Sequence, residues 1–125
     1  VARVFMVDED RTTLAVLSAF ARRGGHCVES FVHPADAARA LRDRRPHVLV
    51  TDRTGGDMAG GELIRAALRA APDLEVLRVV DPREVPGASP PGEEGASVLT
   101  KPVTPRAFDR ALRRAVRRRR SEVHS

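Results

Sequence analysis

Short apolar runs alternate with amphipathic stretches along the chain, and this alternation limits the possible folds more than any other feature of the sequence. The runs with the length and composition of buried strands are residues 4–7, 26–31, 48–51, 74–80 and 97–100. The amphipathic stretches begin at residues 11, 34, 62 and 105. Strands that are separated by helical crossovers form a mainly parallel sheet with helices on both faces. We therefore predict a doubly wound α/β fold with a five-stranded parallel sheet.

The ends of the predicted helices carry capping signals. Asp10 can cap a helix that runs to about Arg23, where two glycines follow. Pro34 suits the first turn of a second helix. Thr104 and Pro105 have the residue types of an N-cap and a first helical position, so the last helix is expected to begin there.

The connection between the fourth and fifth strands breaks the alternation. Residues 81–96 contain four prolines and three glycines, which are too many helix breakers for a stable helix of useful length. We expect the helix at this place to be missing or reduced to a turn. Arg78, in the middle of the fourth strand, agrees with this, because one face of an uncovered strand would meet water. The alternative is a snorkelling arginine on a face that is still covered, with its charged end in water.

Length and composition indicate one soluble domain with an aliphatic core. The 125 residues suffice for a single core, and an aromatic share of 3% leaves its packing to Leu, Val and Ala. We place the domain at residues 1–120 and a flexible tail at 121–125. No apolar stretch approaches the roughly 20 residues of a membrane span, and no secretory signal is recognisable. Cys27 is the single cysteine and is expected to be buried in its strand; these features favour a cytoplasmic protein.

The net charge of +5 is concentrated near the end of the chain. Residues 110–120 hold seven arginines and no acid, so the rest of the chain is close to neutral by comparison. Three interpretations are open: a solvated helix end favoured by the helix dipole, a linker into a further domain, or an arm that binds polyphosphates. Aromatic residues do not interleave with these arginines, which removes base stacking as support for the third. We therefore do not expect this domain to bind nucleic acid.

Charged side chains follow three of the predicted strands. Asp8 and Glu9 come after the first strand, Asp52 after the third and Lys101 at the end of the fifth; the carboxyl ends of such strands border one cleft. Clustered carboxylates repel one another unless a cation binds between them, and an all-oxygen site with open positions suits Mg²⁺. The metal would hold a phosphoryl group in line with a carboxylate nucleophile, and Lys101 would bind a phosphoryl oxygen. The four histidines show no metal-ligand spacing and are interpreted as surface or cap residues.

Three segments resemble, in order and spacing, the signature segments of response-regulator receiver domains: VFMVDED, VLVTDRTGGDMAGGELI and VLTKPVTP. The likeness covers all but the ends of the chain and implies a flavodoxin-like sheet with strand order 2-1-3-4-5. By this resemblance Asp52 matches the phosphoacceptor, and Lys101 matches the lysine that contacts the phosphoryl group. The metal ligands that it implies are Asp8, Glu9, Asp52 and the backbone carbonyl of Thr54.

The sequence departs from the family at the positions that usually transmit phosphorylation. Asp81 stands where receivers usually have Thr or Ser, Val98 occupies the usual aromatic switch position three residues before Lys101, and Gly56 replaces a loop proline. A carboxylate at Asp81 would repel phosphorylated Asp52, or would pair with Lys101 in place of the phosphoryl group. An alternative interpretation is therefore a degenerate receiver, a protein-interaction module whose output does not depend on phosphorylation.

The resemblance implies a signalling domain and not a classical enzyme, with at most a Mg²⁺-dependent self-phosphorylation from a phosphodonor. A histidine kinase or a phosphotransfer protein would supply the phosphoryl group to Asp52, and an output domain or protein partner would receive the signal. No membrane partner is expected. Receivers often dimerise through the surface around the fifth strand, so a homodimer is one expected assembly, although the loss of the neighbouring helix argues against that route.

Overall fold

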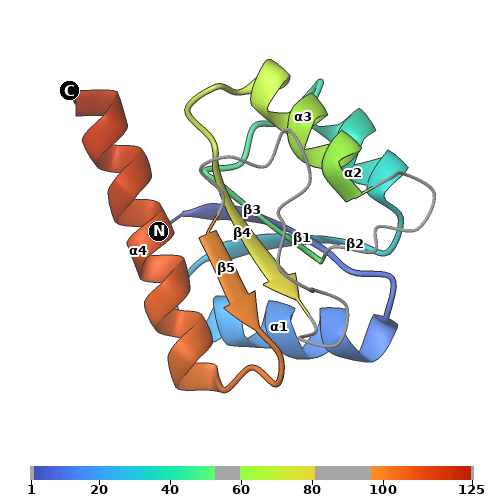
Figure 1. Ribbon diagram of the computed structural model, residues 1–125, viewed down its shortest axis with the longest axis vertical. Coiled ribbons are helices and arrows are strands. Elements are labelled where there is room, and N and C mark those ends of the chain that lie inside the picture. Colours follow the sequence, from blue (N-terminus) through green and yellow to red (C-terminus); the bar gives the residue numbers. More distant parts are fainter. Residues whose placement is uncertain (1, 53–59, 81–96, 125) are drawn as a thin grey trace.

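The computed structural model of the chain describes residues 2–52, 60–80 and 97–124. Its strands are β1 (Arg3–Val7), β2 (Cys27–Phe31), β3 (Val48–Asp52), β4 (Glu75–Val80) and β5 (Ser97–Thr100). Its helices are α1 (Arg11–Arg23), α2 (Pro34–Ala40), α3 (Gly60–Ala70) and α4 (Pro105–His124), as Figure 1 shows. The ends of every strand lie within one residue of the predicted ends.

The strands form one parallel sheet in the order β2-β1-β3-β4-β5. β1 lies between β2 and β3, so that Val4 is opposite Val28 on one side and Val48 on the other. β4 pairs with β3 and with β5. The predicted doubly wound α/β fold and its strand order are therefore confirmed. In such a sheet the chain reverses its direction of winding between β1 and β3, and ligands bind at the carboxyl ends of the strands at that point.

Each face of the sheet has its own apolar core. α1 and α4 cover one face, and α2 and α3 cover the other (Figure 1). Alternate residues of β1 contribute to the two cores, because successive side chains of a strand point to opposite faces. Val4 and Met6 pack with α1 and α4, whereas Phe5 and Val7 pack with α2 and α3. Both sides of β1 are thus buried from Val4 to Val7, which fixes the position of the strand and of Asp8 after it.

The predicted caps are present at two helices. Asp10 is the N-cap of α1, and its carboxylate accepts hydrogen bonds from the backbone N–H groups of Thr12 and Thr13 at 2.9 and 3.3 Å. The hydroxyl of Thr104 accepts a hydrogen bond from the N–H of Ala107 at 3.1 Å, at the start of α4. Pro34 begins α2, as predicted.

The helix labelled α4 follows β5 and continues to His124. It runs past residue 120, where the sequence placed the end of the domain, and the division into a domain and a tail stays a prediction. This helix is not the one expected to be missing, which would join β4 to β5. Residues 81–96 lie outside the described residues, so that expectation also stays a prediction. No helix in the described ranges is long and apolar enough to cross a membrane.

Two side chains are placed differently from the expectation. Arg78 is buried, with 3% of its surface exposed. Its face of β4 is therefore covered, as in the alternative, but its charged end does not reach water as a snorkelling arginine would. Cys27 is exposed and not buried. The reason is its position at the start of β2, an edge strand with a neighbouring strand on one side only.

Two histidines accept hydrogen bonds from the backbone at the start of β1. His26, just before β2, accepts a hydrogen bond at Nδ1 from the N–H of Ala2 at 3.3 Å, and His47, just before β3, accepts one at Nδ1 from the N–H of Arg3 at 2.8 Å. Burial lowers the pKa of both imidazoles, and at His47 the charges of Arg119 and Arg3 lower the pKa further. An Nδ1 atom that accepts a hydrogen bond carries no proton. Both contacts therefore require a neutral histidine.

The free energy of unfolding is expected to fall as the pH drops below about 6.5. The pKa of His47 lies below its ordinary value of 6.5 in the folded chain, so the unfolded chain binds the proton more readily. The contribution of His47 is fully present above that value and is lost as the pH falls through the lowered pKa. His47→Asn keeps an acceptor and does not titrate, so its stability should change less between about pH 7.5 and about pH 5.5. His47→Leu should cost about 0.5–1.5 kcal/mol already at the higher pH.

Urea denaturation across this pH range measures both effects. His33→Asn is the control, because His33 is exposed and its side chain makes no capping hydrogen bond. A pH profile of His47→Asn identical to that of the native chain would show that the His47 contact does not titrate in this range.

Candidate functional site

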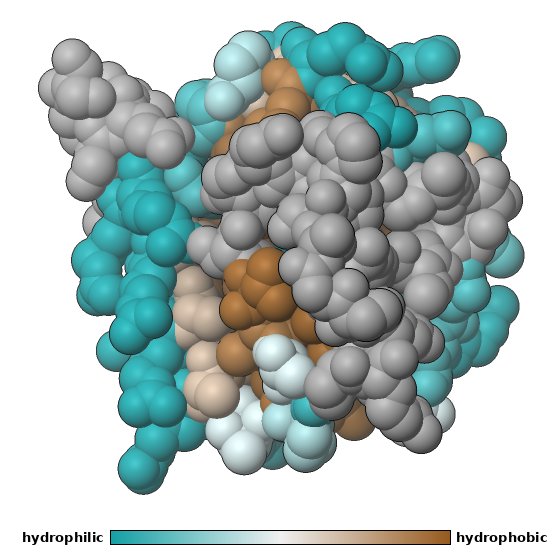
Figure 2. Space-filling view, viewed as in Figure 1, coloured by the Kyte–Doolittle hydropathy of each residue, from teal (hydrophilic) through white to brown (hydrophobic). Residues whose placement is uncertain are grey.

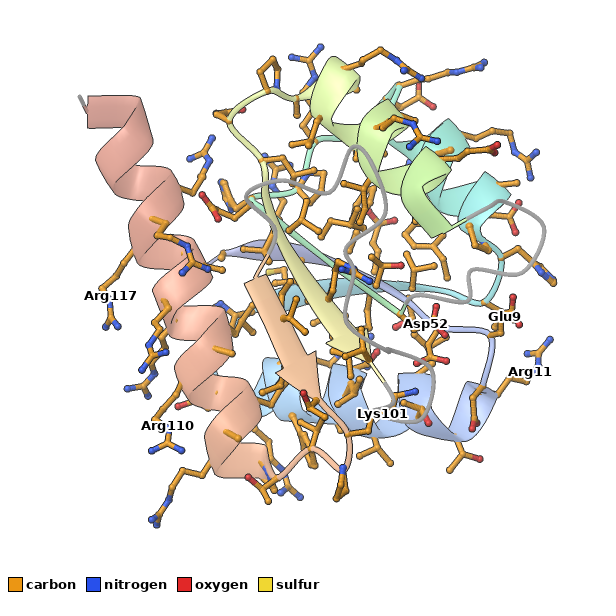
Figure 3. The ribbon with its side chains drawn as sticks, viewed as in Figure 1. Glu9, Arg11, Asp52, Lys101, Arg110 and Arg117 are labelled. Carbon is orange, nitrogen blue, oxygen red and sulfur yellow. The ribbon has the colours of Figure 1, made fainter. Side chains whose placement is uncertain are left out.

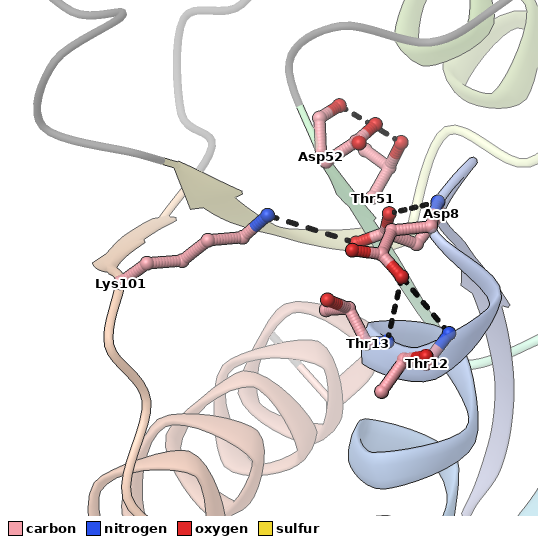
Figure 4. Close-up of polar contacts among 7 residues, drawn as sticks. Asp8, Thr12, Thr13, Thr51, Asp52 and Lys101 are labelled. Carbon is pink, nitrogen blue, oxygen red and sulfur yellow. Dashed lines mark hydrogen bonds and ion pairs between the residues drawn. The ribbon is translucent and has the colours of Figure 1, made fainter.

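Three charged side chains lie together at one edge of the sheet. Asp8 follows β1, Asp52 is the last residue of β3, and Lys101 follows β5. Figure 3 shows Glu9, Asp52 and Lys101 at this edge, and Figure 4 shows the ammonium group of Lys101 directed toward Asp8. The parallel strands bring these positions together, because their carboxyl ends all point to the same edge.

Asp8 is held firmly in a buried place, with 3% of its surface exposed. Its N–H donates to the carbonyl of Phe31 at 3.1 Å, and its Oδ1 accepts from the N–H of Asp10 at 2.9 Å. Its Oδ2 lies 3.9 Å from Nζ of Lys101. Burial raises the pKa of Asp8, against the opposing effects of the Asp10 N–H, the charge of Lys101 and the neighbouring carboxyl of Asp52. A further positive charge beside Asp8 would therefore stabilise its ionised form.

Asp52 ends a strand that is buried along its whole length. The aliphatic residues before it pair with β1 on one side and β4 on the other, which fixes the backbone at Asp52. The hydroxyl of Thr51 donates to the carbonyl oxygen of Asp52 at 3.1 Å (Figure 4). Asp52 itself is 8% exposed, and its carboxyl group is close enough to Asp8 to act on the pKa of that residue. The edge of the sheet thus holds two neighbouring acids with little access to water.

Lys101 is fixed by its backbone, whereas its side chain is partly exposed and reaches toward Asp8. Its N–H donates to the carbonyl of Val80, the last residue of β4, at 2.7 Å. The Lys101–Pro102 peptide bond is cis. The side chain is 30% exposed, so the ammonium group is a positive charge on a long, rotatable stem at the opening of the site.

Of the other predicted site residues, the structure places Glu9 and Val98 and does not describe Thr54 and Asp81. Glu9 is exposed and lies at the same edge (Figure 3). Thr54 and Asp81 lie outside the described residues, so the expected carbonyl ligand and the acid at the switch position are not placed. Val98, at the position of the usual aromatic switch, is a β5 residue with 53% of its surface exposed.

The oxygen atoms at this edge suit a small divalent cation. Mg²⁺ is usually bound in proteins through one or two carboxylates and several waters, and Asp8 and Asp52 supply two neighbouring carboxyl groups. Within residues 2–52, 60–80 and 97–124, no three His, Cys, Asp or Glu side chains gather into a metal-binding group. Two carboxylates alone would leave coordination positions open for a ligand.

Comparison with solved structures identifies the fold. A response regulator receiver domain protein from Clostridium thermocellum is 21% identical to this chain, with a TM-score of 0.85 and coverage of 96% of this chain and 98% of that one. The chain has the receiver fold. A CheY-like receiver domain protein from Methanospirillum hungatei is 21% identical, with a TM-score of 0.82 and coverage of 96% and 97%. NtrX from Brucella abortus aligns with a TM-score of 0.88 at 19% identity, and the alignment covers 98% of this chain but 29% of that longer one.

Two curated relatives are regulators and one is an acyltransferase, and all three are much longer than this chain. DctD of Rhizobium meliloti, a C4-dicarboxylate transport transcriptional regulatory protein, is 27% identical over 118 residues, which are 94% of this chain and 26% of DctD. The DNA-binding transcriptional regulator NtrC of Proteus hauseri is 30% identical over 100 residues, 79% of this chain and 21% of NtrC. A 75-residue stretch is 40% identical to a phosphate acyltransferase of Nostoc punctiforme and covers 58% of this chain and 22% of that protein.

The chain thus spans about a fifth to a quarter of the length of these relatives. No family model matches it. The receiver fold together with two response regulators among the relatives confirms the resemblance to receiver domains that the sequence indicated.

Proposed function

We propose that this chain is a two-component signalling receiver that accepts a phosphoryl group on Asp52 and relays the signal to an output domain or protein partner. The observation that carries the proposal is the pair of buried, neighbouring acids Asp8 and Asp52, with Lys101 3.9 Å from Asp8, at the carboxyl edge of a receiver fold. Buried acids are costly to place side by side, so a site that gathers them is better explained by a charged ligand than by stability.

In this proposal Asp52 is the nucleophile. A carboxylate oxygen of Asp52 attacks the phosphorus of the donor, a new O–P bond forms, and the bond between phosphorus and the donor breaks. A phosphohistidine of a histidine kinase or phosphotransfer protein is the expected donor, and its imidazole leaves with the electron pair of the broken bond and takes a proton from solvent. The chain receives the group and does not turn over a substrate as a classical enzyme does.

The residues around Asp52 would help to neutralise the negative charge of the incoming phosphoryl group. Asp8, Glu9, Asp52 and the backbone carbonyl of Thr54 would hold Mg²⁺, which supplies positive charge between the acids and the phosphoryl oxygens. The side chain of Lys101 would move from Asp8 to a phosphoryl oxygen, which its exposed stem allows. A cytoplasmic location, where kinases and Mg²⁺ are at hand, is part of this proposal.

Incubation with acetyl phosphate and Mg²⁺ is expected to add one phosphoryl group to the native chain. The carboxylate of Asp52 is the expected acceptor, so Asp52→Asn should gain none, and omission of Mg²⁺ should remove most of the gain because the acids and the phosphoryl group would then repel one another. Intact-mass spectrometry measures the gain directly.

Asp10→Asn is the matched control for this experiment. It removes an acid close to Asp8 but keeps the side-chain oxygen that caps α1, so it should be phosphorylated like the native chain. An equal gain in Asp52→Asn would place the acceptor elsewhere. No gain in a folded native chain would leave the phosphorylation-independent interaction module as the function of the receiver fold.

A further inference from the structure

The solvent side of α4 carries a row of arginines. Between residues 105 and 119 the helix holds seven arginines and a single acid, Asp109. Four of the arginines follow one another at intervals of four, three and four residues, which places them on one side of a helix. We name this row the arginine stripe, and its members are Arg106, Arg110, Arg113 and Arg117. All four side chains are exposed.

The arginine stripe lies opposite the side of α4 that packs on the sheet. Phe108, Leu112 and Ala115 are buried in the core, and the helical period places them on the side of α4 away from the stripe. Figure 3 shows the side chains of Arg110 and Arg117 extending from α4 into solvent, and Figure 2 shows hydrophilic surface along α4. The packing of α4 therefore presents the stripe to solvent over a length of about 16 Å.

A groove beside β5 is a separate surface. It is open, has a volume of about 390 Å³, and lies between α4 and the strands β4 and β5. Leu77, Val98 and Leu99 of the strands form its apolar floor. Arg110 is the single member of the arginine stripe among the described residues that line it. The stripe as a whole therefore lies on the back of α4 and not on the surface that α4 shares with β5.

Little of the charge of the arginine stripe is neutralised by neighbouring acids. Asp109 is the acid of α4 itself, and its Oδ2 lies 3.1 Å from Nε of Arg113. In the part of the chain that the structure describes, the other three arginines of the stripe form no ion pair. The stripe therefore keeps three positive charges for a negatively charged partner.

Two further arginines anchor the helix that carries the stripe. Nε of Arg118 donates to Oε2 of the buried Glu75 at 3.2 Å, at the start of β4. Arg119 donates to Asp73, just before β4, at 3.0 Å. These contacts and the packed ring of Phe108 fix α4 on the sheet at two places. The backbone under the stripe is thus held before any partner arrives, which lowers the entropic cost of binding.

A row of guanidinium groups matches a chain of phosphates. Each guanidinium can donate two parallel hydrogen bonds to one phosphate group. A nucleic-acid duplex carries one negative charge per about 1.7 Å of its axis, so a row of about 16 Å faces several phosphates. An α-helix also has a diameter that the major groove of DNA admits. We propose that the arginine stripe binds the phosphate backbone of a nucleic-acid duplex.

The scarcity of aromatic side chains favours a duplex over a single strand. Proteins bind single strands largely by stacking the bases on aromatic side chains, and the one aromatic residue of α4, Phe108, is completely buried. Contacts with phosphates position a duplex without stacking. Stacking was the ground on which the sequence disfavoured nucleic acid, and a duplex does not need it.

An anionic membrane fits the arginine stripe less well. A helix that lies on a membrane buries an apolar side among the lipid headgroups, but the apolar side of α4 is already buried against the sheet. The large hydrophobic side chains that are exposed among the described residues are Val16 and Val98, and neither belongs to α4. Charge attraction alone would remain for the membrane.

This inference does not depend on phosphorylation. The arginine stripe contains none of the residues Asp8, Asp52 and Lys101, so binding can be measured in a chain that has no phosphoacceptor. Asp52→Asn is expected to bind a duplex with an affinity within about twofold of the native chain. A failure of phosphorylation and a failure of duplex binding are therefore separate results.

The test uses fluorescein-labelled DNA and RNA duplexes of about 20 base pairs and of the same arbitrary sequence, at salt concentrations from about 25 to about 150 mM. Fluorescence anisotropy should show saturable binding, and the logarithm of the association constant should fall against the logarithm of the salt concentration with a slope of about −3, as expected for three free arginines on phosphates. Comparison of the two duplexes shows whether DNA or RNA is the tighter source of the backbone.

Arg106→Gln/Arg110→Gln/Arg117→Gln should weaken binding at least about tenfold at about 25 mM salt and remove most of the salt dependence, because the three free charges are lost. Glutamine keeps a long side chain and a similar helix propensity. Circular dichroism confirms that the variant is folded.

A matched variant separates the stripe from general charge attraction. Arg42→Gln/Arg45→Gln/Arg69→Gln changes the net charge equally at three exposed positions. These positions follow α2 or lie in α3, on the other face of the sheet from α4. The affinity for the duplex should therefore stay within about twofold of that of the native chain.

Four outcomes would overturn the proposal. The first is no binding of either duplex by the folded native chain at the lowest salt concentration. The second is an equal loss of affinity in the matched variant at positions 42, 45 and 69. The third is tighter binding of the single strand than of the duplex. The fourth is binding to vesicles of phosphatidylserine and phosphatidylcholine that the stripe variant loses while its duplex binding is unchanged, which would assign the stripe to a membrane surface.

Discussion

Phe108→Ala is expected to lower the free energy of unfolding by about 3–5 kcal/mol. Phe108 is completely buried on the inner side of α4, and its ring lies 6.2 Å from that of Phe20 on α1. The chain has four phenylalanines and no tryptophan or tyrosine, and the other α4 residues that pack in this core are Ala111, Leu112, Ala115 and Val116. These smaller side chains cannot fill the cavity, so most of the lost packing would not be recovered.

Equilibrium denaturation in urea measures this loss, and an unchanged dependence on urea concentration would show that the native state stays compact. Val16→Ala is the control, because Val16 is half exposed on α1, the helix that contains Phe20. Its cost in the free energy of unfolding should stay within about 0.5 kcal/mol. Phe108→Leu should cost less than Phe108→Ala because it leaves a smaller cavity. A loss below about 1 kcal/mol in Phe108→Ala would contradict the packing of α4 against α1.

Mg²⁺ is expected to stabilise the native chain but not Asp8→Asn. A ligand that binds the folded state alone at a concentration of 100 times its Kd adds about 2.7 kcal/mol to the free energy of unfolding. Asp8 is the more deeply buried acid of the site, and asparagine keeps its shape but removes the charge that would attract the cation. Thermal unfolding of both chains with Mg²⁺ and with a chelator gives the difference.

Asp10→Asn again serves as the comparison, because its side chain caps α1 and should not be needed for the metal. The native chain and Asp10→Asn should then share the same gain in Tm. A gain of the same size in Asp8→Asn would move the Mg²⁺ site away from the carboxyl edge of β1.

The sheet was predictable because its signals are local and repeated. The run at residues 48–51 is apolar without alternation, as expected for a strand with neighbours on both sides, and β3 is buried throughout. The caps at Asp10 and Thr104 were readable from residue type alone. Exposure of single side chains was not predictable in the same way. Cys27 was predicted wrongly and Arg78 was left between two interpretations, because their environments depend on which strand is an edge and on what covers each face.

The candidate site was predictable where residues follow directly on strands. Asp8, Asp52 and Lys101 meet because the ends of parallel strands meet, while Glu9, one residue further along, is exposed. A groove between α4 and the strands β4 and β5 was not foreseen, because the arginine-rich run was interpreted as a chain end. The four-residue spacing of Arg110, Arg114 and Arg118 was the available signal, but only the packing of α4 beside β5 shows that it borders an apolar floor.

The position of β1 between two later strands has a consequence for the nascent chain. β1 emerges with apolar residues on both faces, and α1 and β2 can cover one face and one edge soon afterwards. Its other edge pairs with β3, so it stays open until residues 48–52 have been synthesised. An open apolar edge is a template for wrong pairing between chains. Ribosome stalling between β2 and β3 is therefore expected to leave this edge of β1 open to wrong pairing.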